Sequence, residues 1–265
     1  MANQYFQKTF RPDMINGDVS VIINSDASDK AFGAKDLLFD WVAVDVPLGT
    51  DCIVDGFLHM YGTDGGVQQS EDLHLLIAKT NNGAAPTSLG TVNNSLATTQ
   101  CYELPDVLIG AMNFEGTTTR AGMIELGGPA GSLYMFNSPG DNGHVGPVVI
   151  QPEPNTLGGQ STNRIYVAGV AGGGFNFSTN IQADGAVTDD ATTSITVKTT
   201  DPRKSFRVGD TVYLHDVDTA LGTIASMTAT NITLNAAIAG GTDIADEDEF
   251  VNAQPITVTL GFRGR

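Results

Sequence analysis

Short runs in which apolar and polar residues alternate, each closed by a turn, recur along the whole chain. Residues 256–262 read Ile-Thr-Val-Thr-Leu-Gly-Phe, and residues 73–80 and 163–170 are similar apolar-rich runs. An alternation of period two places the apolar side chains on one face of a β-strand. Turn sequences such as Asp64-Gly65-Gly66 and Val208-Gly209-Asp210 separate the runs. The sequence therefore predicts an all-β fold built from short strands and tight turns.

The composition argues against long helices. Exposed helix faces are normally rich in Ala, Leu, Glu, Lys and Arg, but this chain has only 13 Lys and Arg residues among 265, whereas it has 31 Gly. One segment is ambiguous. Residues 104–109 fit either a single helical turn or a strand, and the pattern does not decide between them.

The character of the chain changes near Asp184. Large aromatic residues become scarce after this point, while Thr, Asp and Ala become common. We expect residues 1–183 to form a β-sandwich or jelly-roll-like domain, and residues 184–250 to form a smaller, barrel-like β domain. The last alternating run resembles the strands of the first domain. We therefore expect residues 184–250 to be inserted, and residues 251–265 to return to the first domain's sheet.

No pattern in the sequence indicates catalysis. The four histidines, His59, His74, His144 and His215, are scattered, although His59 and His74 could pair across a sheet. No zinc-protease, nucleophile-elbow or phosphate-binding motif is present. A glycosidase would need two carboxylates and aromatic platforms, but Trp41 lies in an apolar strand and is expected in the core. We predict a protein that is not an enzyme, with no catalytic residues, no cofactor-binding residues and no assigned metal ligands.

Acidic loops raise the question of calcium. Asp184, Asp189-Asp190, Asp216–Asp218 and Asp246–Glu249 offer the oxygen ligands that calcium prefers, but none of these segments matches the twelve-residue EF-hand loop. Solvated loop acids are the commoner arrangement, so calcium stays an open alternative. Cys52 and Cys101 are likewise open: they either form one disulfide or are two free thiols, and a reducing cytosol favours thiols.

The net charge of −17 limits the partners. So acidic a surface repels nucleic-acid phosphates and anionic lipids, which argues against direct nucleic-acid or membrane binding. It suits docking on basic protein surfaces, although colloidal stability accounts for it equally well. There is no membrane-length apolar run and no secretory signal, so we expect synthesis in the cytoplasm.

The two ends of the chain carry the candidate partner-binding residues. Near the N-terminus, aromatic residues stand beside basic ones in a locally basic arm, and the C-terminus ends in a second basic tip; the candidates are Tyr5, Phe6, Phe10, Arg11, Phe262 and Arg263. Two arrangements are open. The aromatic residues either anchor the chain in a partner subunit or pack back on the chain's own sandwich.

Residues 206–238 resemble the small β module found in head and decoration proteins of tailed phages. The shared pattern is a Val-Gly-Asp turn, an apolar strand, a Gly-x-Ile strand and an Ile-Thr-Leu strand, here at 208–210, 211–214, 222–227 and 232–234. The composition of the first 180 residues, with the segment 45–50, also resembles sandwich domains of phage virion proteins. The long spine helix of the major capsid shell fold is missing.

This resemblance implies a structural protein of a virion. A capsid decoration or cement protein that binds the outer capsid surface is the leading expectation, with the major capsid protein or other virion subunits as partners and a homo-oligomer as the assembled form. A tail-tube, head-completion or fibre-base subunit is the first alternative. A carbohydrate-binding module is the second, for which Tyr61, Tyr102 and Tyr134 are the candidate sugar-stacking residues.

Overall fold

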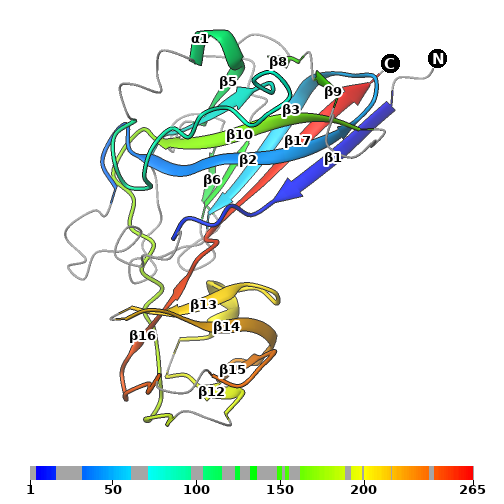
Figure 1. The fold of residues 1–265 in the computed structure, drawn as a ribbon. Coiled ribbons are helices and arrows are strands. Elements are labelled where there is room, and N and C mark those ends of the chain that lie inside the picture. The colour runs from blue at the N-terminus through cyan, green and yellow to red at the C-terminus, as the bar shows by residue number, and fades with distance from the viewer. Residues whose placement is uncertain are drawn as a thin grey trace.

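The computed structural model confirms the predicted all-β fold. It describes residues 4–15, 32–60, 71–96, 104–114, 123–125, 132–135, 148–150, 153–154, 162–188, 192–198, 200–215, 217–238 and 242–264. Figure 1 shows two lobes: a larger one made of two packed sheets, which we call the sandwich, and a smaller one below it, the small lobe. None of the described helices is long and apolar enough to cross a membrane.

The first sheet of the sandwich contains both ends of the described chain. Its strand order is β1 (Gln4–Phe10), β17 (Ile256–Gly264), β3 (Thr50–Met60), β7 (Ser132–Met135) and β6 (Met123–Glu125), and β8 (Val148–Val149) pairs with β3. The burial of β17 follows its sequence: Ile256, Val258 and Leu260 are buried, and the threonines between them are only half-buried. The period-two pattern of residues 256–262 is therefore the pattern of a strand with one face in the core.

The second sheet has the order β2 (Leu37–Pro47), β10 (Thr162–Ala171), β4 (Leu73–Ala78) and β5 (Leu108–Phe114), with β9 (Glu153–Pro154) on β10. The ambiguous segment contains both predicted structures, because a single helical turn, α1 (Leu104–Val107), leads directly into β5. The two sheets bury one shared apolar core between them, with Ile53, Leu58 and Val258 from the first and Leu75, Ile165 and Val167 from the second.

The outer faces of the two sheets differ. Outward apolar residues of the second sheet, including Leu37, Trp41 and Leu76, pack against Leu89, Leu96 and Leu104 of the connecting segment between β4 and β5. Trp41 is half-buried there, and its indole donates a hydrogen bond to the carbonyl of Thr87 (3.0 Å). No comparable apolar cover over the outer face of the first sheet appears among the residues whose placement is described.

The small lobe is a third antiparallel sheet with its own core. Its order is β11 (Ile181–Gln182), β16 (Glu249–Asn252), β13 (Thr211–Leu214), β14 (Val217–Met227), β15 (Asn231–Leu234) and β12 (Ser194–Thr196), and a short 3-10 helix, η4, spans Pro202–Lys204. Phe206, Val212, Ile224, Ile232 and Phe250 form its centre.

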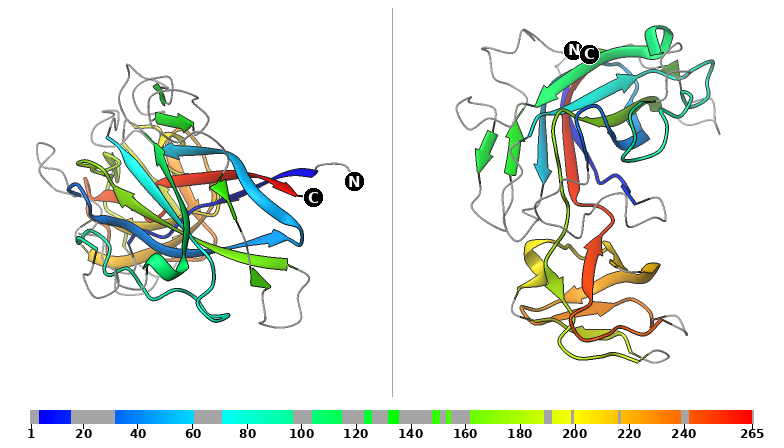
Figure 2. Two further views of the ribbon diagram at one scale, coloured as in Figure 1. Left: turned by 90° about the horizontal axis from the view of Figure 1, so that it is seen from above. Right: turned by 90° about the vertical axis from the view of Figure 1, so that its left-hand side faces the viewer.

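Two neighbouring strands connect the lobes. The chain enters the small lobe through β11 and leaves it through β16, and these strands pair directly, with Ile181 opposite Phe250. Figures 1 and 2 show the two connections running side by side. Phe250 packs in the core of the small lobe, whereas Val251 packs in that of the sandwich. The chain then continues into β17, between β1 and β3.

Candidate interaction site at the paired termini

The two terminal segments that carry the predicted partner-binding residues pair with each other. β1 and β17 are antiparallel neighbours over seven consecutive positions without a register shift, and Tyr5 lies opposite Arg263, Phe6 opposite Phe262 and Phe10 opposite Val258. Residues 4–10 are thus a strand of the first sheet rather than a free arm.

The inner face of this ladder belongs to the sandwich core. Phe262 is fully buried, and its ring stacks on that of Phe6 with centroids 5.2 Å apart and planes at 10°. Phe6 and Phe10 are partly buried against the same core. Of the two arrangements left open by the sequence, these aromatic residues adopt the second, because they pack on the chain's own sandwich. A partner-binding role for Phe6 and Phe10 stays a prediction.

The outer face of the ladder presents Tyr5. The Tyr5 side chain is 54% exposed, and its hydroxyl lies 3.1 Å from the nearer carboxylate oxygen of Asp55 on β3. The amide of Gln7 donates to the same hydroxyl (2.8 Å). Since β17 lies between β1 and β3, the Tyr5 side chain crosses β17 and lies along the sheet. We call Tyr5, Gln7, Asp55 and Gly261 the Tyr5 platform.

Gly261 makes this crossing possible. A Cβ at position 261 would stand 1.7 Å from the Asp55 Oδ1 and 2.7 Å from the Tyr5 hydroxyl. The hydroxyl and the carboxylate therefore meet directly above a backbone that has no side chain. Burial raises the pKa of Tyr5, the hydrogen bond from Gln7 opposes this shift, and the Asp55 hydrogen bond adds to it.

The row of the sheet that begins with Tyr5 also carries a charged side chain and a buried thiol. Arg263, 46% exposed, has its Nε 3.9 Å from the Asp51 carboxylate. Cys52, opposite Arg263 on β3, is a buried free thiol whose pKa is raised mainly by burial. Cys101 lies outside the described residues. The exposed Val149 of β8 pairs with Cys52 and ends the row.

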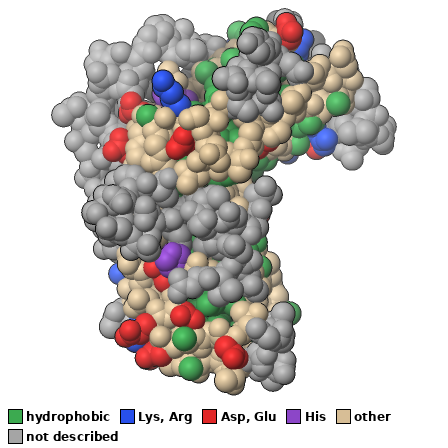
Figure 3. Space-filling model, turned by 60° about the vertical axis from the view of Figure 1, so that its left-hand side comes forward, with side chains coloured by type: hydrophobic (Ala, Val, Ile, Leu, Met, Phe, Trp, Pro, Cys, Tyr) green, Lys and Arg blue, Asp and Glu red, His purple; other side chains and the backbone are tan. Residues whose placement is uncertain are grey.

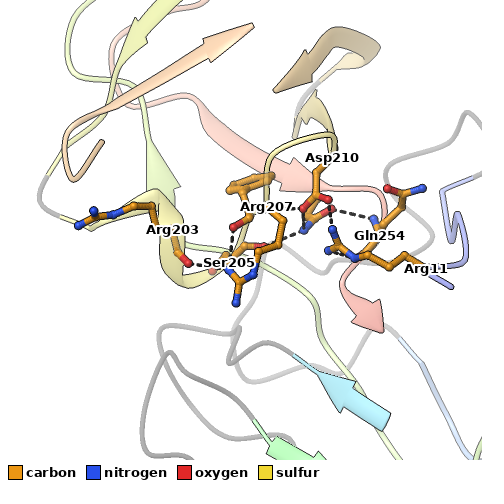
Figure 4. Close-up of polar contacts among 8 residues, drawn as sticks. Arg11, Arg203, Ser205, Arg207, Asp210 and Gln254 are labelled. Carbon is orange, nitrogen blue, oxygen red and sulfur yellow. Dashed lines mark hydrogen bonds and ion pairs between the residues drawn. The ribbon is translucent and has the colours of Figure 1, made fainter. Parts of the chain in front are cut away.

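Arg11, the remaining predicted residue, joins the two lobes. It follows β1 directly, and its guanidinium forms an ion pair with the Asp210 carboxylate of the small lobe and donates to the carbonyl of Gln254 (2.6 Å). Figure 4 shows Arg11 and Asp210 pointing toward each other, with Gln254 beside them. A backbone hydrogen bond from Met14 to Ala253 (2.9 Å) fixes the same segment three residues later.

Asp210 is buried and receives several donors. Its side chain is 1% exposed, and its second oxygen accepts from the backbone N–H of Arg207 (2.7 Å) and the amide of Asn252 (3.0 Å). Gly209, with φ of +93°, gives the Val208-Gly209-Asp210 turn the left-handed residue it needs. A buried carboxylate needs such donors to offset its desolvation.

The acids at 246–249, which were weighed as calcium ligands, have protein partners. Lys198 lies 3.1 Å from Asp246 and 2.9 Å from Glu247, and the N–H of Gly185 donates to Asp246 (2.9 Å). Asp189, Asp190 and Asp216 lie outside the described residues. Figure 3 shows acidic side chains gathered at the end of the small lobe remote from the sandwich. The described part of the chain contains no group of three or more His, Cys, Asp or Glu residues arranged to hold a metal ion.

The histidines are separated. His59 is in β3 of the first sheet and His74 in β4 of the second, so the pairing across one sheet that the sequence allowed is wrong. The ring of His74 instead lies 2.9 Å from the Asn113 side chain on the neighbouring strand. His144, Tyr61 and Tyr102 lie outside the described residues, and Tyr134 is in β7.

Four residues of this site were not predicted as site residues from the sequence: Gln7, Asp55, Gly261 and Asp210. Asp55 and Gly261 are an ordinary acid and an ordinary glycine of alternating strands, and only the pairing of β3 with β17 brings them to Tyr5. Asp210 carried a signal, because it ends a Val-Gly-Asp turn, but the turn does not reveal that its carboxylate is buried.

Comparisons with known proteins do not assign this chain to a family. No protein-family model and no curated protein matches this sequence. One similar solved structure is the crystal structure of a serine protease of Aeromonas sobria, at 9% sequence identity and a TM-score of 0.18. The alignment spans all of this chain but only 28% of that protein. With so low a TM-score, this likeness carries no argument.

Proposed function

We propose that this chain is a non-enzymatic structural protein of a tailed-phage virion, and that it decorates the outer surface of the capsid by contacts with the major capsid protein or other subunits. The observation that carries the proposal is the contrast between the two sheets. The second sheet is covered by the chain's own apolar residues, while the described outer face of the first carries Tyr5, Arg263 and Val149, each close to half exposed or more.

The scaffold behind this face supports the same proposal. Both terminal strands are locked into one ladder, and Arg11 fixes the end of that ladder to the small lobe. A subunit held in this way loses little conformational freedom on binding. In a symmetric shell, contacts of modest strength act together because each is repeated at every equivalent position. The resemblance of residues 206–238 to the phage β module is the reason for proposing a tailed-phage virion as the particle.

Co-sedimentation with capsids tests the proposal. Capsid shells of the phage that encodes this chain, prepared without it, should bind the purified protein saturably at a fixed ratio to the major capsid protein. An unrelated shell of similar size is the control. Failure to bind at protein concentrations far above those in an infected cell would contradict the proposal.

The mass of the purified protein separates the leading role from its first alternative. A decoration protein is expected as a monomer or small oligomer, whereas a tail-tube or head-completion subunit is expected to form a closed ring of defined order. Sedimentation-velocity analysis distinguishes these forms, and a ring would contradict the decoration role.

A further inference from the structure

We propose that the Tyr5 platform is a contact site for an arginine side chain of a partner protein. The inference deepens the proposed function, on which it rests for the identity of the partner as another virion subunit. The site itself is argued from the geometry and charge of the platform.

The ring of Tyr5 is held in place before any partner arrives. Its hydroxyl is bound at 3.1 Å by Asp55 and at 2.8 Å by Gln7, so that it donates to the first and accepts from the second. The side chain nevertheless stays 54% exposed. A partner therefore meets an aromatic surface whose rotamer is already fixed, so little side-chain entropy is lost on contact. The Tyr5 hydroxyl is already hydrogen-bonded, so the exposed part of the ring is the surface that a ligand can contact.

The charge around the ring favours a cation. The face of an aromatic ring attracts cations through its quadrupole, and the Asp55 carboxylate stands at the rim of this one. The chain as a whole carries a net charge of −17. Arg263 lies directly opposite Tyr5 on β17, and its Nε is 3.9 Å from the Asp51 carboxylate, which offsets its charge. Ring and carboxylate together form an electronegative position on the sheet surface.

Arginine suits this position better than lysine. A guanidinium is planar, is weakly hydrated, stacks on aromatic faces and can give parallel hydrogen bonds to a carboxylate at the same time. The platform offers a ring and a carboxylate oxygen side by side. A sugar is favoured less, because Tyr5 is the one aromatic residue among the exposed large hydrophobic side chains of the described part of the chain, and its hydroxyl and Gln7 already bond each other.

The experiment is a titration of the full-length protein with two short peptides, followed through the ring signals of labelled tyrosine by NMR. The peptides are acetyl-Gly-Arg-Gly-amide and its citrulline counterpart, which has the same shape without the charge. We expect the Tyr5 signals to shift saturably with the arginine peptide, at an affinity about two- to fivefold higher than for citrulline, the range of an exposed cation–π contact.

Three variants separate the platform from general attraction to an acidic protein. Tyr5→Leu keeps the charge and should remove the preference for arginine over citrulline. Asp55→Asn should weaken it, while Asp184→Asn, an equal loss of charge at an exposed position of the small lobe, should leave it unchanged. A backbone amide spectrum of each variant verifies that the fold is intact, and Tyr5→Phe keeps the ring if Tyr5→Leu disturbs β1.

Equal affinity for the two peptides would overturn the proposal, as would an undiminished arginine preference in Tyr5→Leu. Saturable shifts of the Tyr5 ring with glucose, galactose or N-acetylglucosamine, without arginine selectivity, would replace it by a glycan site. The virion proposal fails differently. If the protein prefers arginine but does not bind its capsid, the arginine site stands and the virion role is contradicted. If the protein binds its capsid equally well with Tyr5→Leu, the virion role stands and the Tyr5 platform has no part in capsid binding.

Discussion

Arg11 and Asp210 stand 199 positions apart in the chain and form the ion pair that ties the end of β1 to the small lobe. Asp210 is almost completely buried, and Arg11 is 19% exposed, so the pair lies at the protected joint between the lobes. Arg11 follows the strand that carries Tyr5 and Phe6. The Arg11 side chain therefore links the pairing of β1 with β17 to the position of the small lobe.

Arg11→Ala should destabilise the protein by about 2–4 kcal/mol. The substitution removes the guanidinium that pairs with the buried Asp210 carboxylate, and breaking a buried ion pair by removing one partner is costly. Urea unfolding measures the effect. The matched control is Arg203→Ala, which removes an exposed arginine from its pair with Asp201 and should cost less than about 1 kcal/mol. Equal losses in the two variants would contradict a stabilising role for the Arg11–Asp210 pair.

Gly261→Ala should separate Tyr5 from Asp55. The new methyl group would occupy the place where the hydroxyl and the carboxylate meet. Because the ends of both side chains can move away, the cost should be limited to the lost hydrogen bond, about 1 kcal/mol. Urea unfolding of Gly261→Ala alone and in an Asp55→Ala background checks this. The glycine substitution should cost clearly less in the second background, and an unchanged cost would place the strain elsewhere.

The alternating strands and the turns were predictable from sequence because a half-buried strand shows its burial in every second residue, as Ile256, Val258 and Leu260 do. The single turn at Leu104–Val107 was ambiguous because four residues are too few to show a helical period. The ladder of Tyr5 with Arg263, and the pair of Arg11 with Asp210, depend on contacts between segments more than 190 residues apart. A local sequence pattern contains no information about such contacts. Tyr5, Arg11 and Arg263 were therefore predicted as site residues, but their pairings were not.

Asp45 should contribute to acid sensitivity. Its carboxylate accepts two hydrogen bonds from Arg164 across the β2–β10 pair, at 2.8 and 3.0 Å, and this contact lowers the pKa of Asp45 from its ordinary 3.8. A lowered pKa gives stability that is present above 3.8 and is lost as the pH falls through the folded-state value. Asp45→Asn should therefore be less stable than the parent near neutral pH, and the difference should shrink as the pH falls below 3.8.

Unfolding free energies measured across this range test the linkage. Asp106→Asn, at an exposed position of α1, is the control and should follow the parent protein throughout. A constant difference between Asp45→Asn and the parent down to the lowest pH would contradict a lowered pKa for Asp45 in the folded protein.

Deletion of residues 184–250 should leave a folded sandwich. The chain enters and leaves the small lobe through two directly paired strands, so a short Gly/Ser link can join the flanks. The product should unfold in one cooperative transition at lower stability, because Arg11 loses Asp210, and the core loses Tyr213, which packs on it from the small lobe. Calorimetry measures both properties, and loss of a cooperative transition would show that these residues are not an autonomous insertion.

Electron cryomicroscopy of the particle that carries the native chain would reveal the place of this protein without any intermediate inference. We expect density for both lobes on the outer surface of a phage head, repeated with the symmetry of the shell, with the Tyr5 face of the first sheet turned toward a neighbouring subunit. A particle in which this chain lies inside the shell or in the tail, or in which the Tyr5 face is turned to solvent at every copy, would refute the decoration role.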